Sequence, residues 1–560
     1  MISSKKQVQQ LAVLLLKKGI TDVVISPGSR NAPLINTFSG ISEFNCRSIV
    51  DERSAAYFAI GLSLAKQQPV AIVCTSGTAS LNYAPAVAEA FYQNIPLIVL
   101  TADRPDYWID QAESQCIRQQ GIYRNFVKKE VNLPLGESEK ELWFAARLIN
   151  ESLNVAVSGL PAPVHINIPL EEPLHQLIDV ELPVIREIKL AEIHSGPTES
   201  EFARLAGMID QSKKILILAG QQNPNSALEN ALSKFVKNTG AVVLHEHLSN
   251  LSDVQFCSSI DSLMASIPDE KTEVFKPDML ISIGGQLVSK SLRQFLRKCK
   301  PEMHWHLSRA WEHFDTYQSL TTVIQTDAVS FFETLSKHLQ PTVSDYQHLW
   351  KNKEAQVNQL RDEFMTNIRF SDLKAFNQIG KHIPENTIIH LGNSSPVRYA
   401  LIHERVKNAV YFSNRGTAGI DGCLSTAVGF ASESEKINTI ILGDLSFFYD
   451  SNALWNKYIG ANLRVIVIHN GGGNIFGMIK GPSDSPAFAE HFFTGNTYKA
   501  EGLANAFGLD YFSATNETEL VRALDGFYSS TQIKASLLEV FTNAEENVKM
   551  FRELFKSVKE

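Results

Sequence analysis

Cysteine is scarce in this sequence, and no cysteine stands at the spacing of a metal site or a disulfide framework. The six cysteines of the 560-residue chain are scattered singly, which argues against a zinc site and indicates a reducing compartment. No apolar run reaches the roughly 18 residues of a membrane span. The N-terminus leads into a polar amphipathic helix rather than a signal peptide. We therefore expect a cytoplasmic protein with no membrane partner.

A basic surface is also lacking. The formal net charge is −8 at neutral pH, and no run of lysine and arginine is interleaved with aromatic residues, so we expect no nucleic-acid partner. Low-complexity stretches and short-period repeats are missing as well. An anionic ligand would have to be held by a local cluster of basic side chains.

Short apolar runs rich in Ile and Val alternate with helix-compatible segments along most of the chain. This alternation predicts doubly wound parallel α/β sheets. The expected strands are residues 22–26, 47–50, 70–75, 97–102 and 164–168, then 215–219, 241–244 and 279–283, then 387–391, 409–412, 437–442, 464–468 and 535–540. A stretch without periodicity at 182–198 predicts a linker, and a polar helix is expected at about 346–370. We predict three such α/β domains, at residues 1–182, 198–340 and 346–560.

Two oxygen-bearing side chains follow neighbouring strands of the third domain. Asp444 follows the run 437–442, and Asn470 follows 464–468. The carboxyl ends of parallel strands meet at one edge of a sheet, where α/β proteins bind ligands. A carboxylate, an amide oxygen and a glycine-rich turn suit Mg²⁺, which prefers hard oxygen ligands. The alternatives are a purely structural Gly-Asp turn and, with weaker support, a dinucleotide site at glycines 471–477.

Polar groups also follow four strands of the first domain, and we expect them to meet along one rim. They are Ser29 with Arg30, residues 51–53, residues 75–78 and residues 102–105, with Gln115 and Arg118 in a loop nearby. Arginine forks bind carboxylates at two points, so this rim predicts a carboxylate site. The alternatives are that the arginines are solvated surface residues and that Glu52 only complements a helix dipole.

Two strand ends of the third domain combine small donors with an arginine. Residues 392–398 include Arg398, and residues 413–422 include Arg415. Hydroxyl groups and glycine backbone N–H groups beside a guanidinium suit phosphate and carboxylate ligands.

Over nearly its whole length the chain resembles thiamine diphosphate (ThDP)-dependent enzymes of the pyruvate-oxidase-like arrangement. That superfamily shows Gly-Asp-Gly and later Asn-Asn, whereas this chain has Leu445 and His469 at two of those places. Leu445 is what the 2-succinyl-5-enolpyruvyl-6-hydroxy-3-cyclohexene-1-carboxylate synthase family of menaquinone biosynthesis shows. The motifs that carry this narrower resemblance are residues 26–30 (SPGSR), 51–53 (DER), 75–79 (TSGTA), 101–105 (TADRP), 414–416 (NRG), 419–422 (GIDG) and 443–446 (GDLS).

The resemblance implies a set of cofactor-binding residues. Glu52 would contact the aminopyrimidine nitrogen N1′ and promote formation of the cofactor carbanion, and Ile420 would support the bent form of ThDP. Mg²⁺, or Mn²⁺, would be held by Asp444, Asn470 and the Gly472 carbonyl. The remaining cofactor contacts implied by the resemblance are Ser394, Gly443, Leu445, Ser446 and Asn474.

The resemblance also implies the reaction, which is decarboxylation of 2-oxoglutarate and 1,4-addition of the succinyl carbanion to isochorismate. Both substrates are dianions, which accounts for a basic pocket in an acidic protein. The substrate-binding set would be Ser29, Arg30, Arg104, Gln115, Arg398, Arg415, Ile475 and Phe476. Ser291 stands where some relatives carry a basic residue, which leaves a role for the middle domain open. Glu52 and Asp444 of different chains would share each site, so the minimum unit is a homodimer, and a dimer of dimers is compatible.

Two other functions stay open from the sequence. One is another ThDP-dependent 2-oxoacid decarboxylase or an acetolactate-synthase-like enzyme, although substrates that are smaller monoanions need fewer arginines. The other is a non-catalytic FAD- or NAD-binding protein that holds its nucleotide in the middle domain. Release of ThDP rather than a yellow flavin on denaturation would distinguish them.

Overall fold

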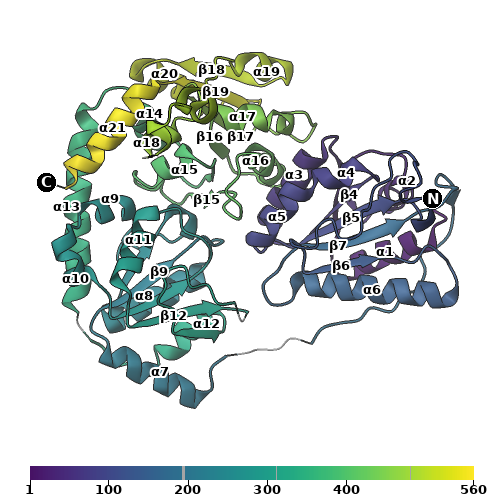
Figure 1. Ribbon diagram of the computed structural model, residues 1–560, viewed down its shortest axis with the longest axis horizontal. Coiled ribbons are helices and arrows are strands. Elements are labelled where there is room, and N and C mark those ends of the chain that lie inside the picture. Colours follow the sequence, from purple (N-terminus) through teal and green to yellow (C-terminus); the bar gives the residue numbers. More distant parts are fainter. Residues whose placement is uncertain (192–195, 311, 343, 480, 560) are drawn as a thin grey trace.

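The structure, a computed structural model, describes residues 1–191, 196–310, 312–342, 344–479 and 481–559. Three parallel sheets with flanking helices follow one another along the chain, which confirms the predicted fold class. In Figure 1 the first domain lies on the right, the middle domain at the lower left and the third at the upper left. None of the helices in these ranges combines the length and apolarity needed to cross a membrane.

The first sheet has the strand order β3-β2-β4-β5-β7-β6, with every neighbouring pair parallel. Its strands are β2 (Asp22–Ile25), β3 (Asn45–Ser48), β4 (Val70–Cys74), β5 (Leu97–Asp103), β6 (Lys129–Asn132) and β7 (Val164–Pro169). Its helices are α1 (Lys6–Lys17), α2 (Ala32–Ser39), α3 (Glu52–Lys66), α4 (Thr78–Asn82), α5 (Ala84–Tyr92) and α6 (Glu139–Val157). A two-stranded antiparallel sheet joins β1 (Ile2–Ser3) to β8 (Leu177–Ile178). β3 starts two residues before the predicted 47–50 and also ends two residues earlier, and the edge strand β6 was not predicted.

The middle sheet is a five-stranded parallel sheet of order β10-β9-β11-β12-β13. Its strands are β9 (Ile215–Ala219), β10 (Val242–His245), β11 (Met279–Ile283), β12 (Met303–Ser308) and β13 (Thr322–Gln325). Its helices are α7 (Glu199–Gln211), α8 (Ser226–Thr239), α9 (Ile260–Ser266), α10 (Thr272–Phe275), α11 (Lys290–Cys299) and α12 (Ala328–Leu335). The predicted polar helix is α13 (Asp345–Asn367), which leads into the third domain and buries Trp350.

The third sheet has the strand order β15-β14-β16-β17-β19-β18, again with parallel neighbours. Its strands are β14 (Ile388–Leu391), β15 (Val410–Phe412), β16 (Asn438–Gly443), β17 (Leu463–His469), β18 (Asp510–Ala514) and β19 (Ser536–Phe541). Its helices are α14 (Asp372–His382), α15 (Ser395–Ala400), α16 (Cys423–Ala431), α17 (Asp444–Tyr449), α18 (Ile475–Met478), α19 (Glu501–Ala506), α20 (Glu517–Phe527) and α21 (Ala544–Ser557). Strand by strand, this is the order of the first sheet.

Helices α3 and α16 hold the first and third domains together. Figure 1 shows them at the junction of the two domains, and one continuous apolar core contains residues of both. A Cβ atom at Gly61 would collide with the Thr426 carbonyl oxygen, and one at Gly429 with that of Phe58. The two glycines therefore let the helix backbones approach closely in a reciprocal manner.

The predicted linker has neither helix nor strand over residues 182–191 and 196–198, and residues 192–195 lie outside the described residues. Its first part is attached to the first domain. Leu182 and Ile185 pack against that core, and the Asn150 side chain donates to Arg186 O (3.1 Å) and accepts from Ile188 N (2.7 Å). The three sheets fall within the three predicted ranges, whose limits stay predictions.

Candidate active site

Asp444 and Asn470 lie side by side at the carboxyl ends of adjacent strands. β16 and β17 pair with Gly443 opposite Ile468, so the residues that follow them are neighbours. Asp444 begins α17 and is 1% exposed, and Asn470 follows β17 and is 7% exposed. The structure thus brings together the two side chains that the sequence predicts as metal ligands.

One oxygen of each residue lacks a partner. Among the described residues, Asp444 Oδ2 and Asn470 Oδ1 are buried without a hydrogen bond. Their other polar atoms are engaged, because Leu445 N donates to Asp444 Oδ1 (2.7 Å) and Asn470 Nδ2 donates to Asp372 Oδ2 (2.9 Å). An unsatisfied buried acceptor costs about 1–3 kcal/mol. A carboxylate and an amide oxygen left free in this way fit a hard divalent cation.

The turn after Asn470 requires glycine. Gly471 and Gly472 have φ values of +83° and +149°, and a Cβ at Gly472 would collide with the carbonyl oxygen of Phe493. The Gly472 carbonyl accepts a bond from Asn474 N (2.9 Å) and keeps a second lone pair. In the described ranges no group of three or more His, Cys, Asp or Glu side chains could hold a metal ion. A cation here would therefore complete its shell with backbone oxygen, water and phosphate.

His469 adds a charged pair that the sequence did not predict. Its Nδ1 lies 2.7 Å from Glu539 Oε1, and its Nε2 lies 3.8 Å from Asp444 Oδ2. Burial alone would lower the pKa of His469, but the bond to Glu539 and the charge of Asp444 outweigh it and raise that pKa. Burial raises the pKa of Asp444 to about 6, and a bound cation would favour its ionised form.

Three loops around Asp444 are tied to one another. Ser446 Oγ donates to Ile420 O (2.9 Å), and Asn393 Nδ2 donates to Gly419 O (2.6 Å). Ser394 has a φ of +73° at the start of α15. Asn474 is buried, and its Nδ2 has no hydrogen-bond partner among the described residues. Leu445 and Gly443 flank Asp444, so the predicted cofactor residues of the third domain lie on connected loops.

The first domain of the same chain fixes the loop that carries Arg415 and Ile420. Glu89 on α5 accepts bonds from Gly416 N (2.7 Å) and from Thr417 N and Oγ1 (2.6 Å each). Tyr57 on α3 donates to Asp421 Oδ2 (3.1 Å). Neither Glu89 nor Tyr57 was predicted as a site residue. The available signal was a lone acid in the otherwise apolar helix α5.

Glu52 begins α3 and is half-buried. The capping bond at this helix start is made by Asp51, whose side chain accepts from Ser54 N, so Glu52 is free of that role. Burial raises the pKa of Glu52. Burial first, and then the charge of Glu52, raises the pKa of Cys74 at the end of β4. The carboxylate of Glu52 is therefore partly shielded from solvent, and its charge acts on Cys74 at the end of β4.

The predicted arginine rim of the first domain is present. Arg30 Nη1 donates to Leu170 O (3.0 Å), and Arg104 Nη2 donates to Ser114 O (3.0 Å). Burial, and then the charge of Arg104, lowers the pKa of Arg30. Gln115 follows Ser114, the residue that Arg104 bonds, and the backbone carbonyl of Gln115 accepts from Ser76 Oγ (2.8 Å). Arg118 lies outside this group of residues, since its side chain is 80% exposed and pairs with Asp110 (2.7 Å). Ser29 lies in the same loop as Arg30.

Arg398 and Arg415 form a second basic pair in the third domain. Arg398 Nη1 donates to Ser394 O (2.6 Å), and Arg415 Nη1 donates to Asn393 Oδ1 (2.7 Å). Burial, and then the charge of Arg398, lowers the pKa of Arg415. Ile475 and Phe476 open α18, and Phe476 packs on Phe492 with ring centroids 5.7 Å apart.

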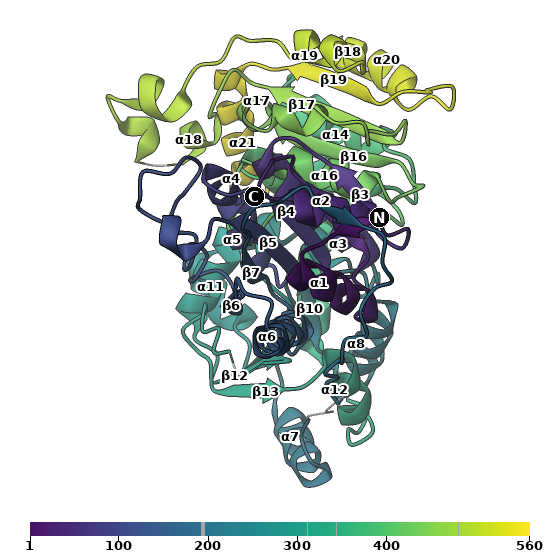
Figure 2. The same ribbon diagram turned by 90° about the vertical axis from the view of Figure 1, so that its right-hand side faces the viewer.

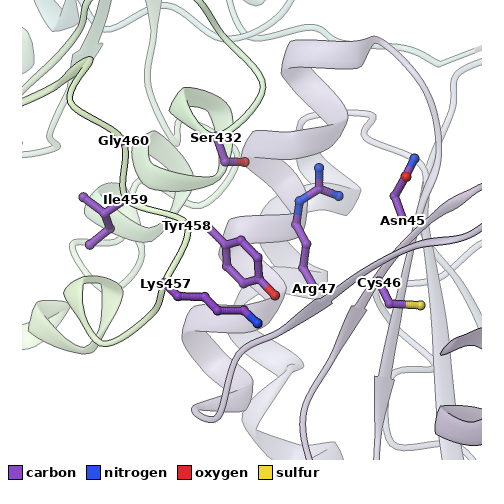
Figure 3. A pocket seen from close by; sticks show the side chains of 8 residues that line it. All are labelled: Asn45, Cys46, Arg47, Ser432, Lys457, Tyr458, Ile459 and Gly460. Atoms are coloured by element: carbon purple, nitrogen blue, oxygen red, sulfur yellow. The ribbon is translucent and has the colours of Figure 1, made fainter.

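A separate cavity of about 490 Å³ lies where β3 faces residues 457–460 of the third domain. Figure 3 shows Arg47, Lys457 and Tyr458 lining it. Arg47 pairs with Asp22 (2.8 Å) and with Glu433, so its charge is already compensated. None of the predicted site residues lines this cavity, and it belongs to the junction between domains.

Comparison with known proteins agrees with this geometry. Residues 6–122 match the family described as thiamine pyrophosphate enzyme, N-terminal TPP binding domain, and residues 189–391 match the middle domain of thiamine pyrophosphate enzymes. The second match ends within the third sheet, at the last residue of β14.

Three relatives named 2-succinyl-5-enolpyruvyl-6-hydroxy-3-cyclohexene-1-carboxylate synthase match nearly end to end. The protein from Bacteroides thetaiotaomicron is 40% identical over 100% of both chains. That from Flavobacterium johnsoniae is 40% identical over 98% of both. That from Desulfotalea psychrophila is 38% identical over 96% of this chain and 99% of its own. The chain therefore belongs to the 2-succinyl-5-enolpyruvyl-6-hydroxy-3-cyclohexene-1-carboxylate synthase family of thiamine pyrophosphate enzymes.

Proposed function

We propose that the protein joins 2-oxoglutarate and isochorismate, with release of CO₂, to form 2-succinyl-5-enolpyruvyl-6-hydroxy-3-cyclohexene-1-carboxylate for menaquinone biosynthesis. The observation that carries the proposal is the pair of buried oxygens, Asp444 Oδ2 and Asn470 Oδ1, without partners among the described residues. Relatives that span the whole chain carry the name of this activity. The alternatives of an acetolactate-synthase-like enzyme and an FAD or NAD protein are not favoured by these names. The six free cysteines fit a cytoplasmic enzyme.

ThDP, when bound, supplies the nucleophilic carbon and the electron sink for decarboxylation and carbon–carbon bond formation. Asp444, Asn470 and the Gly472 carbonyl would hold Mg²⁺ or Mn²⁺, and Ile420 would support the cofactor from the loop fixed by Glu89. Glu52 would share a proton with the aminopyrimidine N1′. Burial raises the pKa of Glu52, which favours the sharing of a proton. Ser394, Gly443, Leu445, Ser446 and Asn474 would complete the cofactor contacts.

The substrates would be held by guanidinium forks. Both are dianions, and a planar fork can bind a carboxylate at two points, which a lysine cannot copy. Arg30 and Arg104 are paired with Glu172 (3.4 Å) and Glu113 (3.1 Å), which a substrate carboxylate would replace. Arg398 and Arg415 supply the second pair, with Ser29, Gln115, Ile475 and Phe476 around them.

We propose that the active unit is at least a homodimer in which Glu52 of one chain serves the Asp444 site of the other. Mixing inactive Glu52→Gln and Asp444→Ala chains, followed by subunit exchange, would then produce some sites with both groups intact. We expect activity to return in the mixture. A mixture that stays inactive, despite exchange shown by mass spectrometry, would contradict shared sites.

The activity itself is tested by incubating the protein with 2-oxoglutarate, isochorismate, ThDP and Mg²⁺ and following the loss of isochorismate absorbance. We expect loss that requires all four components, with CO₂ release in equal amount. Asp444→Ala is the matched control and should lose the metal-dependent rate. Turnover of pyruvate in place of 2-oxoglutarate would favour the acetolactate-synthase-like alternative.

A further inference from the structure

The metal ligand Asn470 has two chemically different ends, and only one can bind a cation. Its Oδ1 is an acceptor and its Nδ2 is a donor, so the amide must be held with the oxygen toward the site. In the structure Nδ2 donates to Asp372 Oδ2 (2.9 Å), and Oδ1 is the atom without a partner among the described residues. Something must therefore favour this orientation over its reverse.

Asp372 accepts the one hydrogen bond that Asn470 Nδ2 makes within the described residues. The two residues belong to different elements of the fold. Asp372 begins α14 and is 0% exposed. An ionised carboxylate accepts but cannot donate, so it can pair with the NH₂ end of Asn470 and not with the oxygen end. The orientation of the amide in the structure is the one in which Asp372 Oδ2 accepts from Nδ2.

Asp372 is itself held in place by two further residues. Thr542 Oγ1 donates to Asp372 Oδ1 (2.5 Å). The backbone N of Asp372 donates to Asn547 Oδ1 (2.7 Å). Asn547 Nδ2 donates in turn to Thr542 Oγ1 (3.0 Å). The position at a helix N-terminus also favours the carboxylate electrostatically. Both oxygens of Asp372 are therefore engaged with protein, and it is not itself arranged as a ligand.

We infer that Asp372 is a positioning residue for the metal site, because it holds the Asn470 amide by Nδ2 and leaves Oδ1 free to bind the cation together with Asp444. This inference rests on the proposed function, since it assumes that Asp444 and Asn470 bind a divalent cation. Groups that orient metal ligands typically change metal affinity about 10–100-fold when they are replaced. The role of Asp372 is thus in binding, and no proton transfer is assigned to it.

The test measures Mn²⁺ affinity by electron paramagnetic resonance in the full-length protein with ThDP, independently of turnover. Asp372→Asn keeps the size of the side chain but can present either end to Asn470, so the amide can reverse. We expect its Mn²⁺ affinity to fall about 10–100-fold. Thr542→Val removes the other donor to Asp372 but keeps the carboxylate that accepts from Asn470 Nδ2, so its Mn²⁺ affinity should fall less than that of Asp372→Asn.

Exchanging the two groups makes the test specific. In the double variant Asp372→Asn with Asn470→Asp, the amide donates to the new carboxylate, which keeps an oxygen for the cation, so affinity should recover. Asn470→Asp alone places two carboxylates against each other and should bind less tightly than the exchanged pair. A purely structural role of Asp372 predicts no such recovery.

The outcomes distinguish a failure of the positioning role of Asp372 from a failure of the proposed metal site. Wild-type affinity in Asp372→Asn, or an exchanged pair no better than that single variant, would overturn the positioning role. Wild-type affinity in Asp444→Ala would overturn the proposed metal site, and the positioning role with it. Circular dichroism and thermal melting of each variant check that a lost affinity is not lost folding.

Discussion

The first and third sheets have the same strand order, and yet their strand ends carry different chemistry. β4 and β5 correspond to β16 and β17. In the first domain, β4 leads to Thr75 and β5 leads to Arg104. In the third domain, β16 leads to Asp444 and β17 leads to Asn470. One arrangement of strands thus presents donors in one domain and oxygen acceptors in the other. The difference illustrates that function lies in the residues placed on a fold rather than in the fold.

The two sets also differ in how they are satisfied. The first-domain arginines have protein partners, including Glu172 and Glu113. Asp444 Oδ2 and Asn470 Oδ1 have no hydrogen bond among the described residues, and Nε2 of the His469 imidazole lies 3.8 Å from Asp444 Oδ2. Arginines that pair with acidic side chains suit substrates that bind and dissociate, because the acidic side chains neutralise the guanidinium charge while no substrate is bound. Unpaired buried oxygens suit a cation that stays bound. Figure 2 shows the third domain above the first, and the apolar core that the two domains share makes them one continuous body.

Glu52 provides the sharpest way to separate catalysis from cofactor binding. Glu52→Gln should lower kcat by about 10²–10⁴-fold, as expected for loss of an acid–base group, while ThDP is still retained. Asp444→Ala should instead lose ThDP together with the metal. Steady-state rates and a thiochrome assay on each purified variant measure both properties. Normal decarboxylation of 2-oxoglutarate by Glu52→Gln would remove Glu52 from the reaction.

The arginines test whether the two domains serve different substrates. Arg415→Lys and Arg104→Lys keep the charge but lose the fork, and each should raise a KM by about tenfold or more, since a charge-assisted bond contributes about 1.5–3 kcal/mol. We expect the two variants to affect different substrates, because Arg104 follows a strand of the first sheet and Arg415 follows a strand of the third. Arg118→Lys, at the exposed ion pair, is the control. If both variants raise the KM of both substrates equally, the two arginines do not bind different substrates.

The reciprocal glycines test the junction between the two domains. Gly61→Ala should destabilise the protein by about 1–3 kcal/mol, as overpacking does, because the new Cβ collides with the Thr426 carbonyl oxygen. Gly207→Ala in α7 has open space around it and should be neutral or stabilising by up to about 1 kcal/mol. Urea unfolding of both variants measures the contrast. Equal stability of the two would show that the close approach of α3 and α16 is unimportant.

The middle domain should respond to pH through a buried histidine. Burial lowers the pKa of His245 to about 3, whereas an unfolded histidine titrates near about 6.5. The unfolded chain therefore binds the extra proton first, and stability is lost as pH falls below about 6.5, by up to about 1.4 kcal/mol per pH unit for this group. His245→Phe should reduce that slope. Urea unfolding at pH 5, 6 and 7 measures it, and an unchanged slope would contradict the assignment.

The sequence predicted the buried parts of the sheets well because their pattern is local. Val70–Cys74 and Leu463–His469 are almost wholly apolar and are buried along their length. The edge strands β6, β13 and β18 were missed, since they mix polar and apolar residues and are only partly buried. Their residues are Lys129–Asn132, Thr322–Gln325 and Asp510–Ala514. Half-buried edge strands carry no continuous apolar run, so their assignment depends on tertiary pairing.

The same limit applies to the site. Asp444, Asn470 and Glu52 could be singled out because they follow predicted strands, and the resemblance to ThDP enzymes suggested the role of Glu52. Their roles in the site stay predictions. Asp372 could not be singled out, because it lies at the start of a helix and acts across the fold. Glu89 and Glu539 did offer a signal, since each is a lone acid inside an apolar segment, and in the structure Glu539 bonds His469. A buried acid in an apolar segment indicates a partner elsewhere in the fold, because an unpaired buried charge is costly.

The apolar core shared across α3 and α16 has a practical consequence for protein engineering. A shortened chain that ends after the first domain, or begins with the third, would leave one side of this helix pair bare. Such a fragment should self-associate or precipitate, as large uncovered apolar surfaces do. Exchange of parts between relatives should therefore transfer the two outer domains as a unit. The middle domain should be moved with them, because it shares a second apolar core with the third domain.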